Sequence, residues 1–174
     1  MNKIIKLGNP ILRTQSDLID EKDFDTIWLK DLIKELFAVM AETGGVGVAA
    51  PQIGENKQVL VFSTGYTKRR KPEINIPDTV LVNPQIEILD DTQISDYEGC
   101  LSLGEIMAIV PRAMKIRYTG LDAMGNEMAR EAEGLEARIV QHEVDHLNGV
   151  LFIDRVVDTQ SMTFYSEFQK RQAE

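Results

Sequence analysis

Apolar residues recur at helical spacing in the first third of the chain. Between residues 25 and 43 they lie three or four positions apart, as in an amphipathic helix with one buried face. Gly44 and Gly45 follow directly and are typical of a helix end, because glycine adopts the left-handed conformation there at little steric cost. We therefore predict a helix over residues 25–43. Its predicted apolar face comprises Ile27, Trp28, Leu32, Ile33, Leu36, Val39 and Met40.

The middle of the chain contains shorter apolar runs that suit strands. Residues 59–62 are continuously apolar, and residues 80–89 alternate between apolar and polar, with Asn83 and Pro84 breaking or edging the strand. Residues 113–117 and 126–132 flank a turn sequence around Gly125, which predicts a hairpin. Several strands are thus expected to follow the first helix with no helix between them.

A second helix is predicted after Gly134, running to about Leu147, with Gly149 just beyond its end. Val140 and Val144 make further faces of this helix apolar, which indicates that it is buried. The order of helix, strands and helix favours an α+β fold with antiparallel sheet over a doubly wound βαβ fold.

Length and composition fit one globular unit. The 174 residues are 43% hydrophobic and 27% charged, the balance of a folded domain rather than of a disordered segment. We therefore expect residues 1–174 to form a single domain. In the tail, residues 156–174, the aromatic residues Phe164, Tyr165 and Phe168 lie at helical spacing and predict a short C-terminal helix.

Charge and cysteine content narrow the partners and the compartment. A net charge of −9 opposes binding to DNA, because the phosphates would be repelled. A single cysteine permits no internal disulfide and suits a reducing compartment. No apolar run approaches the roughly 18 residues of a membrane span, and the start has no signal or transit pattern. We expect a cytoplasmic monomer that binds neither membranes nor DNA.

The chain has only two histidines, His142 and His146, and both lie on the second predicted helix. Residues four apart share a helix face, so both imidazoles can reach one ion. Glu143 lies about 100° around the helix from His142, where it can contact a water beside the ion without ligating the metal. The alternative is a pair of core histidines satisfied by hydrogen bonds. A metal site is favoured, because both histidines belong to one H-E-x-x-H pattern on a helix predicted to be buried, where unpaired imidazoles would be costly.

A catalytic site of this kind needs a third protein ligand. Cys100, in the segment E-G-C-L-S, offers a thiolate that suits iron or zinc. Taken alone, a single cysteine is more often a small buried hydrophobe. Asp154, Asp158 and Glu167 are the downstream alternatives, and none lies in a recognisable ligand motif. We favour Cys100.

A run of small residues, G-V-G-V-A-A-P-Q, occupies positions 45–52. Small residues permit close approach of the backbone to a ligand or to a helix. Gln52 offers an amide donor that could polarise a substrate carbonyl. The run lacks the G-K-[ST] ending of a phosphate loop, and a tight turn with small-residue packing is the structural alternative.

These three segments, G-V-G-V-A-A-P-Q, E-G-C-L-S and Q-H-E-V-D-H, occur in the order and spacing of the peptide deformylases, and the chain resembles that family from about residue 4 to residue 155. The resemblance implies an α+β fold in which antiparallel β-sheets surround a central buried helix that carries H-E-x-x-H. It implies a metal-dependent hydrolase that removes the N-formyl group from the formylmethionine of newly made polypeptides and releases formate. The implied cofactor is one Fe²⁺ ion, which zinc, nickel or cobalt can replace.

The resemblance also implies roles for single residues. The implied metal ligands are Cys100, His142 and His146, and the implied acid–base is Glu143. Gln52 and the backbone N–H of Leu101 match the groups that stabilise the negative oxygen of the reaction. Gly47 matches the glycine beside the bound substrate, and Val46 and Gly99 are assigned to the same substrate-binding set. Glu98 and Asp145 are candidates for carboxylates that orient ligands or pair with Arg112.

One segment departs from the family pattern. After E-G-C-L-S, Gly104 stands where proline is common, and Met107 stands where an arginine that can contact the substrate backbone often lies. Both changes bear on peptide preference rather than on the metal ligands.

Two other functions stay open. One is a metallopeptidase with a downstream ligand, and the other is a divergent paralogue that binds formylated nascent chains with weak or altered activity. The basic cluster at residues 68–71 is interpreted either as a transient contact with ribosomal RNA or as a solvated loop.

Overall fold

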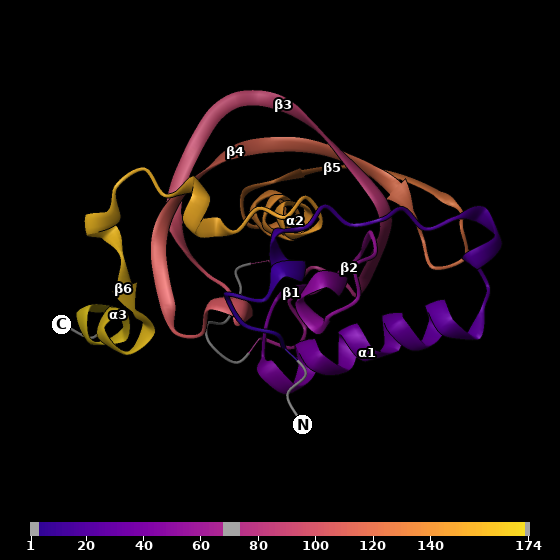
Figure 1. The fold of residues 1–174 in the computed structure, drawn as a ribbon. Helices are drawn as coiled ribbons and strands as arrows, with labels where there is room; N and C mark the ends of the chain where they lie inside the picture. The colour runs from indigo at the N-terminus through magenta and orange to yellow at the C-terminus, as the bar shows by residue number, and fades with distance from the viewer. Residues whose placement is uncertain (1–3, 68–73, 173–174) are drawn as a thin grey trace.

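The computed structural model describes residues 4–67 and 74–172, and the basic cluster at residues 68–71 falls outside these ranges. A long helix, a curved antiparallel sheet, a second helix and a short last helix follow one another along the chain (Figure 1). The helices are α1 (Ile27–Thr43), α2 (Gly134–Leu147) and α3 (Tyr165–Gln172). The strands are β1 (Gly47–Ala49), β2 (Val59–Phe62), β3 (Thr79–Gly99), β4 (Ile106–Leu121), β5 (Glu127–Glu133) and β6 (Thr163–Phe164).

Helix α1 ends at Thr43 as predicted but begins at Ile27, two residues later than predicted. The Thr26 hydroxyl accepts a hydrogen bond from the Leu29 backbone N–H at 3.3 Å, and Gly44 ends the helix with a φ of 67°. Two members of the predicted apolar face are wrong, because Ile27 is 78% exposed and Trp28 is 40% exposed. Both lie in the first turn, before the buried stripe begins at Leu29. From there the stripe follows the predicted spacing.

The described strands form one antiparallel sheet in the order β1-β2-β3-β4-β5, with β6 paired to β4. The α+β class with antiparallel sheet is therefore confirmed. Strand β3 is far longer than the ten residues predicted, and it pairs with β4 from Val82 opposite Leu121 to Gly99 opposite Met107. The register shifts three times along this pair, so both strands bend.

Asn83 does not break β3. It has a positive φ of 51°, next to the first register shift. Its side-chain amide bonds to both backbone groups of Ile19 at 2.9 Å, accepting from the N–H and donating to the carbonyl. An asparagine that satisfies a neighbouring segment in this way keeps the strand continuous through an irregular position.

Helix α2 lies inside the curve of the sheet. Figure 1 shows it nearly end-on, with β3, β4 and β5 arching over it and with β1 and β2 on its other side. Ile139, Val140 and Leu147 of α2 pack in one core cluster with side chains of β2 and β4. The Tyr118 hydroxyl of β4 also donates a hydrogen bond to Glu136 of α2 at 3.0 Å. The position of α2 is thus set by both apolar and polar contacts.

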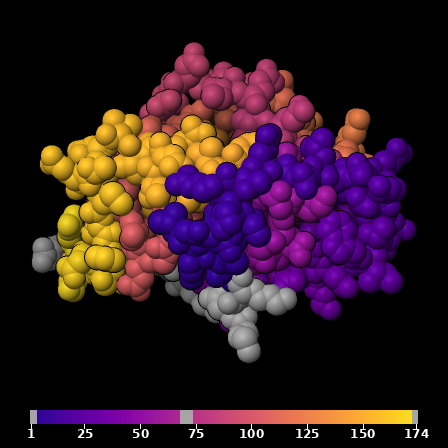
Figure 2. Space-filling model, in the orientation of Figure 1, coloured from indigo at the N-terminus to yellow at the C-terminus, as the bar shows by residue number. Residues whose placement is uncertain are grey.

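The C-terminal segment lies beside the sheet on the side away from α1 (Figures 1 and 2). Its helix, α3, begins only at Tyr165, and Phe164 belongs to β6, where it is 59% exposed. In the described part of the chain, no helix is both long and apolar enough to cross a membrane.

Candidate metal centre

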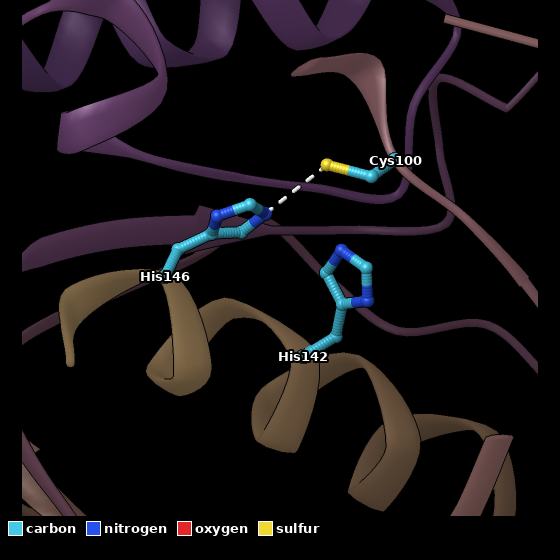
Figure 3. A group of neighbouring side chains, drawn as sticks. All are labelled: Cys100, His142 and His146. Carbon is cyan, nitrogen blue, oxygen red and sulfur yellow. Dashed lines mark hydrogen bonds between the residues drawn. The ribbon is translucent and has the colours of Figure 1, made fainter. Parts of the chain in front are cut away.

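His142 and His146 project from one face of α2 toward Cys100, which follows the end of β3 (Figure 3). The ligand atoms that these three side chains offer lie within 4.8 Å of one another. The shortest pair joins Cys100 Sγ to His146 Nε2 at 3.2 Å. Cys100 and His146 are buried, whereas 11% of the His142 side chain is exposed. The structure therefore brings the three predicted ligands together, and their binding of a metal stays a prediction.

The chemistry of this cluster fits a divalent metal. One thiolate and two imidazoles are good ligands for iron, zinc, nickel and cobalt, and three protein ligands leave a position open for water or substrate. Burial, and then the positive charge of His142, holds the pKa of His146 well below its usual range, so its imidazole is neutral as a ligand must be. Burial alone would lower the pKa of His142, but hydrogen bonds with Cys100 and Glu98 raise it. A metal ion that binds Nε2 would have to displace the proton from that nitrogen, so metal binding by this cluster should release protons.

Glu98 orients the first histidine. Its Oε2 accepts a hydrogen bond from His142 Nδ1 at 2.8 Å, which leaves Nε2 as the free ligand atom of that ring. Burial alone would raise the pKa of Glu98, but hydrogen bonds from His142 and Arg112 and their positive charge hold it far below its usual range. The carboxylate is therefore ionised, and the predicted ligand-orienting role of Glu98 has a direct contact behind it.

Arg112 joins the two predicted carboxylates. It donates to both oxygens of Glu98 at 2.9 and 3.0 Å and to Asp145 Oδ2 at 2.5 Å, and all three side chains are buried. Two further arginines complete the network: Arg138 donates to Glu98 at 2.7 Å, and Arg155 donates to both oxygens of Asp145 at 2.7 and 2.6 Å. The sequence prediction missed Arg138 and Arg155. Of these two, only Arg138 gave a signal in the sequence, because it lies one helical turn before His142 and therefore on the same side of the helix.

Glu143 lies on α2 between the two histidines and packs against Gly47 of β1. A Cβ atom at residue 47 would lie 2.8 Å from both Cγ and Cδ of Glu143, so only glycine fits beside this side chain. Glu143 Oε2 is buried and has no hydrogen-bond partner among the described residues. Burial is the main reason that the pKa of Glu143 rises to about 7, with the Glu98 charge adding to it against the opposing His142 charge. A carboxyl group of this pKa can both accept and donate a proton near neutral pH.

A hydrogen bond from β1 holds the Gln52 side chain next to Cys100. Its Oε1 accepts a hydrogen bond from the Ala49 backbone N–H at 2.8 Å, so its amide nitrogen faces Cys100 Sγ at 3.5 Å. The N-terminal segment joins this loop to the one after Cys100. Ile5 N–H donates to the Gln52 carbonyl at 2.8 Å, and Lys6 donates to the Leu101 carbonyl at 2.9 Å.

A cleft of about 1000 Å³ opens over the cluster. Eight of the nine residues that the sequence assigned to the metal, to catalysis or to the substrate line it: Val46, Gly47, Gln52, Gly99, Cys100, Leu101, His142 and Glu143. His146 lies behind them as a buried residue. Tyr165 and Phe168 of α3 also line this cleft, and the sequence prediction did not include them.

The family model for polypeptide deformylases matches residues 1–162. The chain belongs to the polypeptide deformylase family. Peptide deformylase 1 of Bordetella pertussis is 42% identical over 158 residues, which cover 91% of this chain and 89% of that protein. Peptide deformylase 1 of Nitrosomonas europaea is 39% identical over 155 residues, 89% of this chain and 87% of that protein. A solved structure of an Acinetobacter baumannii peptide deformylase bound to Met-Ala-Ser superimposes with a TM-score of 0.84 at 34% identity, covering 88% of this chain and 96% of that one.

Membership of the peptide deformylases makes the chain a metal-dependent hydrolase, which agrees with the sulfur and nitrogen donors found together here. The structure also gives a reason for one departure from the family pattern. Gly104 has a φ of 72°, whereas proline is fixed near −65°, so proline could not stand here in this conformation.

Proposed function

We propose that this peptide deformylase removes the formyl group from N-formylmethionyl peptides and nascent chains, releasing formate, and that it does so at the Cys100–His142–His146 cluster. The observation that carries the proposal is the convergence of these three ligand atoms within 4.8 Å, beside a buried carboxyl group with a pKa of about 7. The Acinetobacter enzyme bound to Met-Ala-Ser supports a peptide that begins with methionine as the product.

Cys100, His142 and His146 would hold one divalent ion, and we propose Fe²⁺, with zinc, nickel or cobalt able to replace it. When bound, such an ion acidifies water and polarises a carbonyl oxygen. Glu98 keeps His142 in the ligating tautomer, and Arg112 keeps Glu98 ionised. The network of buried charges thus supports the ligands rather than the substrate.

Glu143 is proposed as the acid–base. It takes a proton from the water that attacks the formyl carbon and delivers a proton to the amine nitrogen as the C–N bond breaks. Water and formamide are thereby converted to formate and a free N-terminus. Its raised pKa suits both transfers, because the same group must lose and regain a proton in each cycle.

Gln52 and the backbone N–H of Leu101 are proposed to stabilise the negative oxygen of the tetrahedral intermediate. Both lie at Cys100, on opposite loops that the N-terminal segment ties together. Loss of one such donor typically costs about 10²–10³ in rate. Gly47, Val46 and Gly99 line the same cleft and are proposed to contact the substrate.

We further propose that residues 1–174 act as one catalytic domain, as a monomer in the cytoplasm, and that contact with the ribosome is transient. The strongly acidic net charge of −9 argues against tight binding to RNA or DNA. Sedimentation of the purified protein, alone and with ribosomes at low salt, measures both the oligomeric state and the contact.

Formate release tests the proposal directly. Protein prepared without oxygen and loaded with Fe²⁺, Ni²⁺ or Co²⁺ should release formate from formyl-Met-Ala-Ser, and Glu143→Gln should retain the metal but lose nearly all activity. If no formate is released with any of the three ions, the protein is not an active deformylase. The remaining hypothesis is then a paralogue that binds formylated chains. Full activity of Glu143→Gln would contradict the assigned acid–base.

Cys100→Ser separates the deformylase from a metallopeptidase with a downstream ligand. Because Cys100 Sγ lies 3.2 Å from His146 Nε2, its replacement should weaken metal binding strongly. A variant at Asp158, which is exposed, serves as the control and should bind metal as the parent does. The reverse pattern would favour the metallopeptidase.

A further inference from the structure

The C-terminal segment is attached to the strand that leads away from the metal cluster. β6 pairs with the start of β4, with Phe164 opposite Ile106 and Thr163 opposite Met107. The Tyr165 backbone N–H donates to the Glu105 carbonyl at 2.8 Å. These contacts fix the first turn of α3 beside the loop that departs from the family pattern.

One face of α3 is turned toward the cleft. The Phe168 ring contacts the Tyr97 ring of β3, with centroids 4.8 Å apart and planes tilted by 55°. Tyr165, Phe168 and Gln169 line the same cleft as Cys100 and His142. The other face is solvated and carries an exposed ion pair between Glu167 and Lys170 at 2.6 Å. An amphipathic helix is therefore packed on the rim of the cleft rather than on the core.

The cleft that α3 borders is lined by apolar side chains together with charged ones such as Asp96 and Arg138. Met107, which pairs with Gly99 and with β6, lines it together with Tyr97 and Phe168. Leu135 of α2 also lines it and is 38% exposed. The match to the family model ends at residue 162, so all of β6 and α3 lies beyond it. The α3 side of the cleft therefore lies beyond the family model, whereas Tyr97, Met107 and Leu135 lie within it.

We propose that α3, held in place by the pairing of β6 with β4, forms a specificity wall of the substrate cleft, in which the Tyr97–Phe168 pair binds an apolar side chain one or two residues after formylmethionine. The inference rests on the proposed function, because it takes the peptide to run through this cleft. A side chain of the substrate is the expected occupant of the wall, because the two rings line the same cleft as the metal cluster. Aromatic rings and Met107 gain from contact with an apolar side chain, whereas a charged side chain would lose solvation there.

Steady-state hydrolysis of four peptides tests the proposal: formyl-Met-Ala-Ser, formyl-Met-Phe-Ser, formyl-Met-Ala-Phe and formyl-Met-Ala-Asp. The parent enzyme should prefer at least one Phe peptide over formyl-Met-Ala-Ser by about tenfold in kcat/KM, as expected for burial of an aromatic side chain, mainly through KM. Phe168→Ala should reduce this ratio to about one, and Phe168→Leu should retain part of it.

Two further variants separate binding from folding. Tyr97→Ser removes the other ring from the sheet side and should cause the same loss of preference without altering the sequence of α3. Phe164→Ala is the matched control, because this aromatic residue lies on β6 but is 59% exposed and does not line the cleft. It should keep the parent ratio.

The outcomes are distinguishable. If the parent enzyme releases formate but has no preference for a Phe peptide, or if Phe168→Ala and Tyr97→Ser keep the preference, the specificity wall is wrong while the deformylase activity stands. If no peptide yields formate, the proposed function itself fails. Calorimetry of the product of the preferred Phe peptide, compared with Met-Ala-Ser, should show the same ratio without turnover.

Discussion

Gly47 of β1 and Glu143 of α2 lie in direct contact, and the missing side chain of the glycine makes room for the carboxylate. A Cβ at residue 47 would lie 2.8 Å from Cγ and Cδ of Glu143 and closer still to Oε1. Because real Cβ atoms do not approach other atoms this closely, an added methyl group must displace the carboxylate. The position of the proposed acid–base therefore depends on the glycine at residue 47.

Gly47→Ala should displace the Glu143 side chain and lower kcat by about 100-fold, the typical cost of a misplacement of about 1 Å in a catalytic group. The metal content should stay the same, because neither residue is among the three ligands. Formate release and metal analysis on the same preparation measure both. Gly65→Ala is the control, since its added Cβ would meet nothing closer than 3.4 Å. Equal kcat in the two variants would show that the carboxylate is not confined by Gly47.

Glu98→Gln should weaken metal binding by about 10- to 100-fold, the usual effect of altering a carboxylate that orients a histidine ligand. The glutamine keeps the size of the side chain but removes the charge that faces His142 Nδ1 at 2.8 Å. Competition with a chelator measures the affinity. Glu87→Gln on the same strand removes an exposed partner of Arg117 and should leave the affinity unchanged. An unaltered affinity in Glu98→Gln would contradict the ligand-orienting role.

Arg112→Met should lower the free energy of unfolding by about 3 kcal/mol, because it leaves two buried carboxylates short of a partner. This is the low end of the usual range, since Arg138 and Arg155 keep their contacts with Glu98 and Asp145. Arg117→Met breaks two exposed ion pairs and should cost at most about 1 kcal/mol. Denaturant unfolding of the metal-free variants gives both values. If both variants lose a similar amount of unfolding free energy, burial does not make the Arg112 ion pairs more important for stability than exposed ones.

Local patterns predicted the helices and most of the metal cluster. The spacing of His142, Glu143 and His146 is a property of one helix, so it could be deduced without knowing the rest of the fold. Cys100 was different, because its approach to His146 depends on how β3 ends. The sequence could offer it as the best third ligand, and only the structure brings the two atoms to 3.2 Å.

Long-range features escaped prediction for physical reasons. Residues 90–99 of β3 are mostly polar and exposed, so they lack the alternation that marks a half-buried strand. They are held by pairing with β4, which local composition does not reveal. In the same way, Arg155 reaches Asp145 through a turn after α2, and Phe168 reaches Tyr97 from the far end of the chain. Such contacts depend on the assembled topology.

Tyr118 of β4 donates a hydrogen bond to Glu136 of α2, and this contact makes the stability of the protein depend on pH in the alkaline range. Burial, and then the charge of Glu136 and the hydrogen bond to it, raises the pKa of Tyr118 far above its usual value of about 10. In the unfolded chain the phenol ionises near pH 10, whereas in the folded protein it stays protonated. The folded state therefore holds one more proton above pH 10, and the free energy of unfolding falls as the pH rises through this range.

Tyr118→Phe should remove this loss. Between pH 9.5 and 11 the parent should lose about 1 kcal/mol more stability than the variant, because one retained proton is worth about 1.4 kcal/mol per pH unit. Tyr66→Phe is the control, since the hydrogen bond of that hydroxyl to Asp78 is exposed and should show a smaller difference. Denaturant unfolding at each pH provides the measurement. Parallel losses in the parent and in Tyr118→Phe would mean that the phenol ionises in the folded protein as well, and that its contact with Glu136 does not hold α2 at high pH.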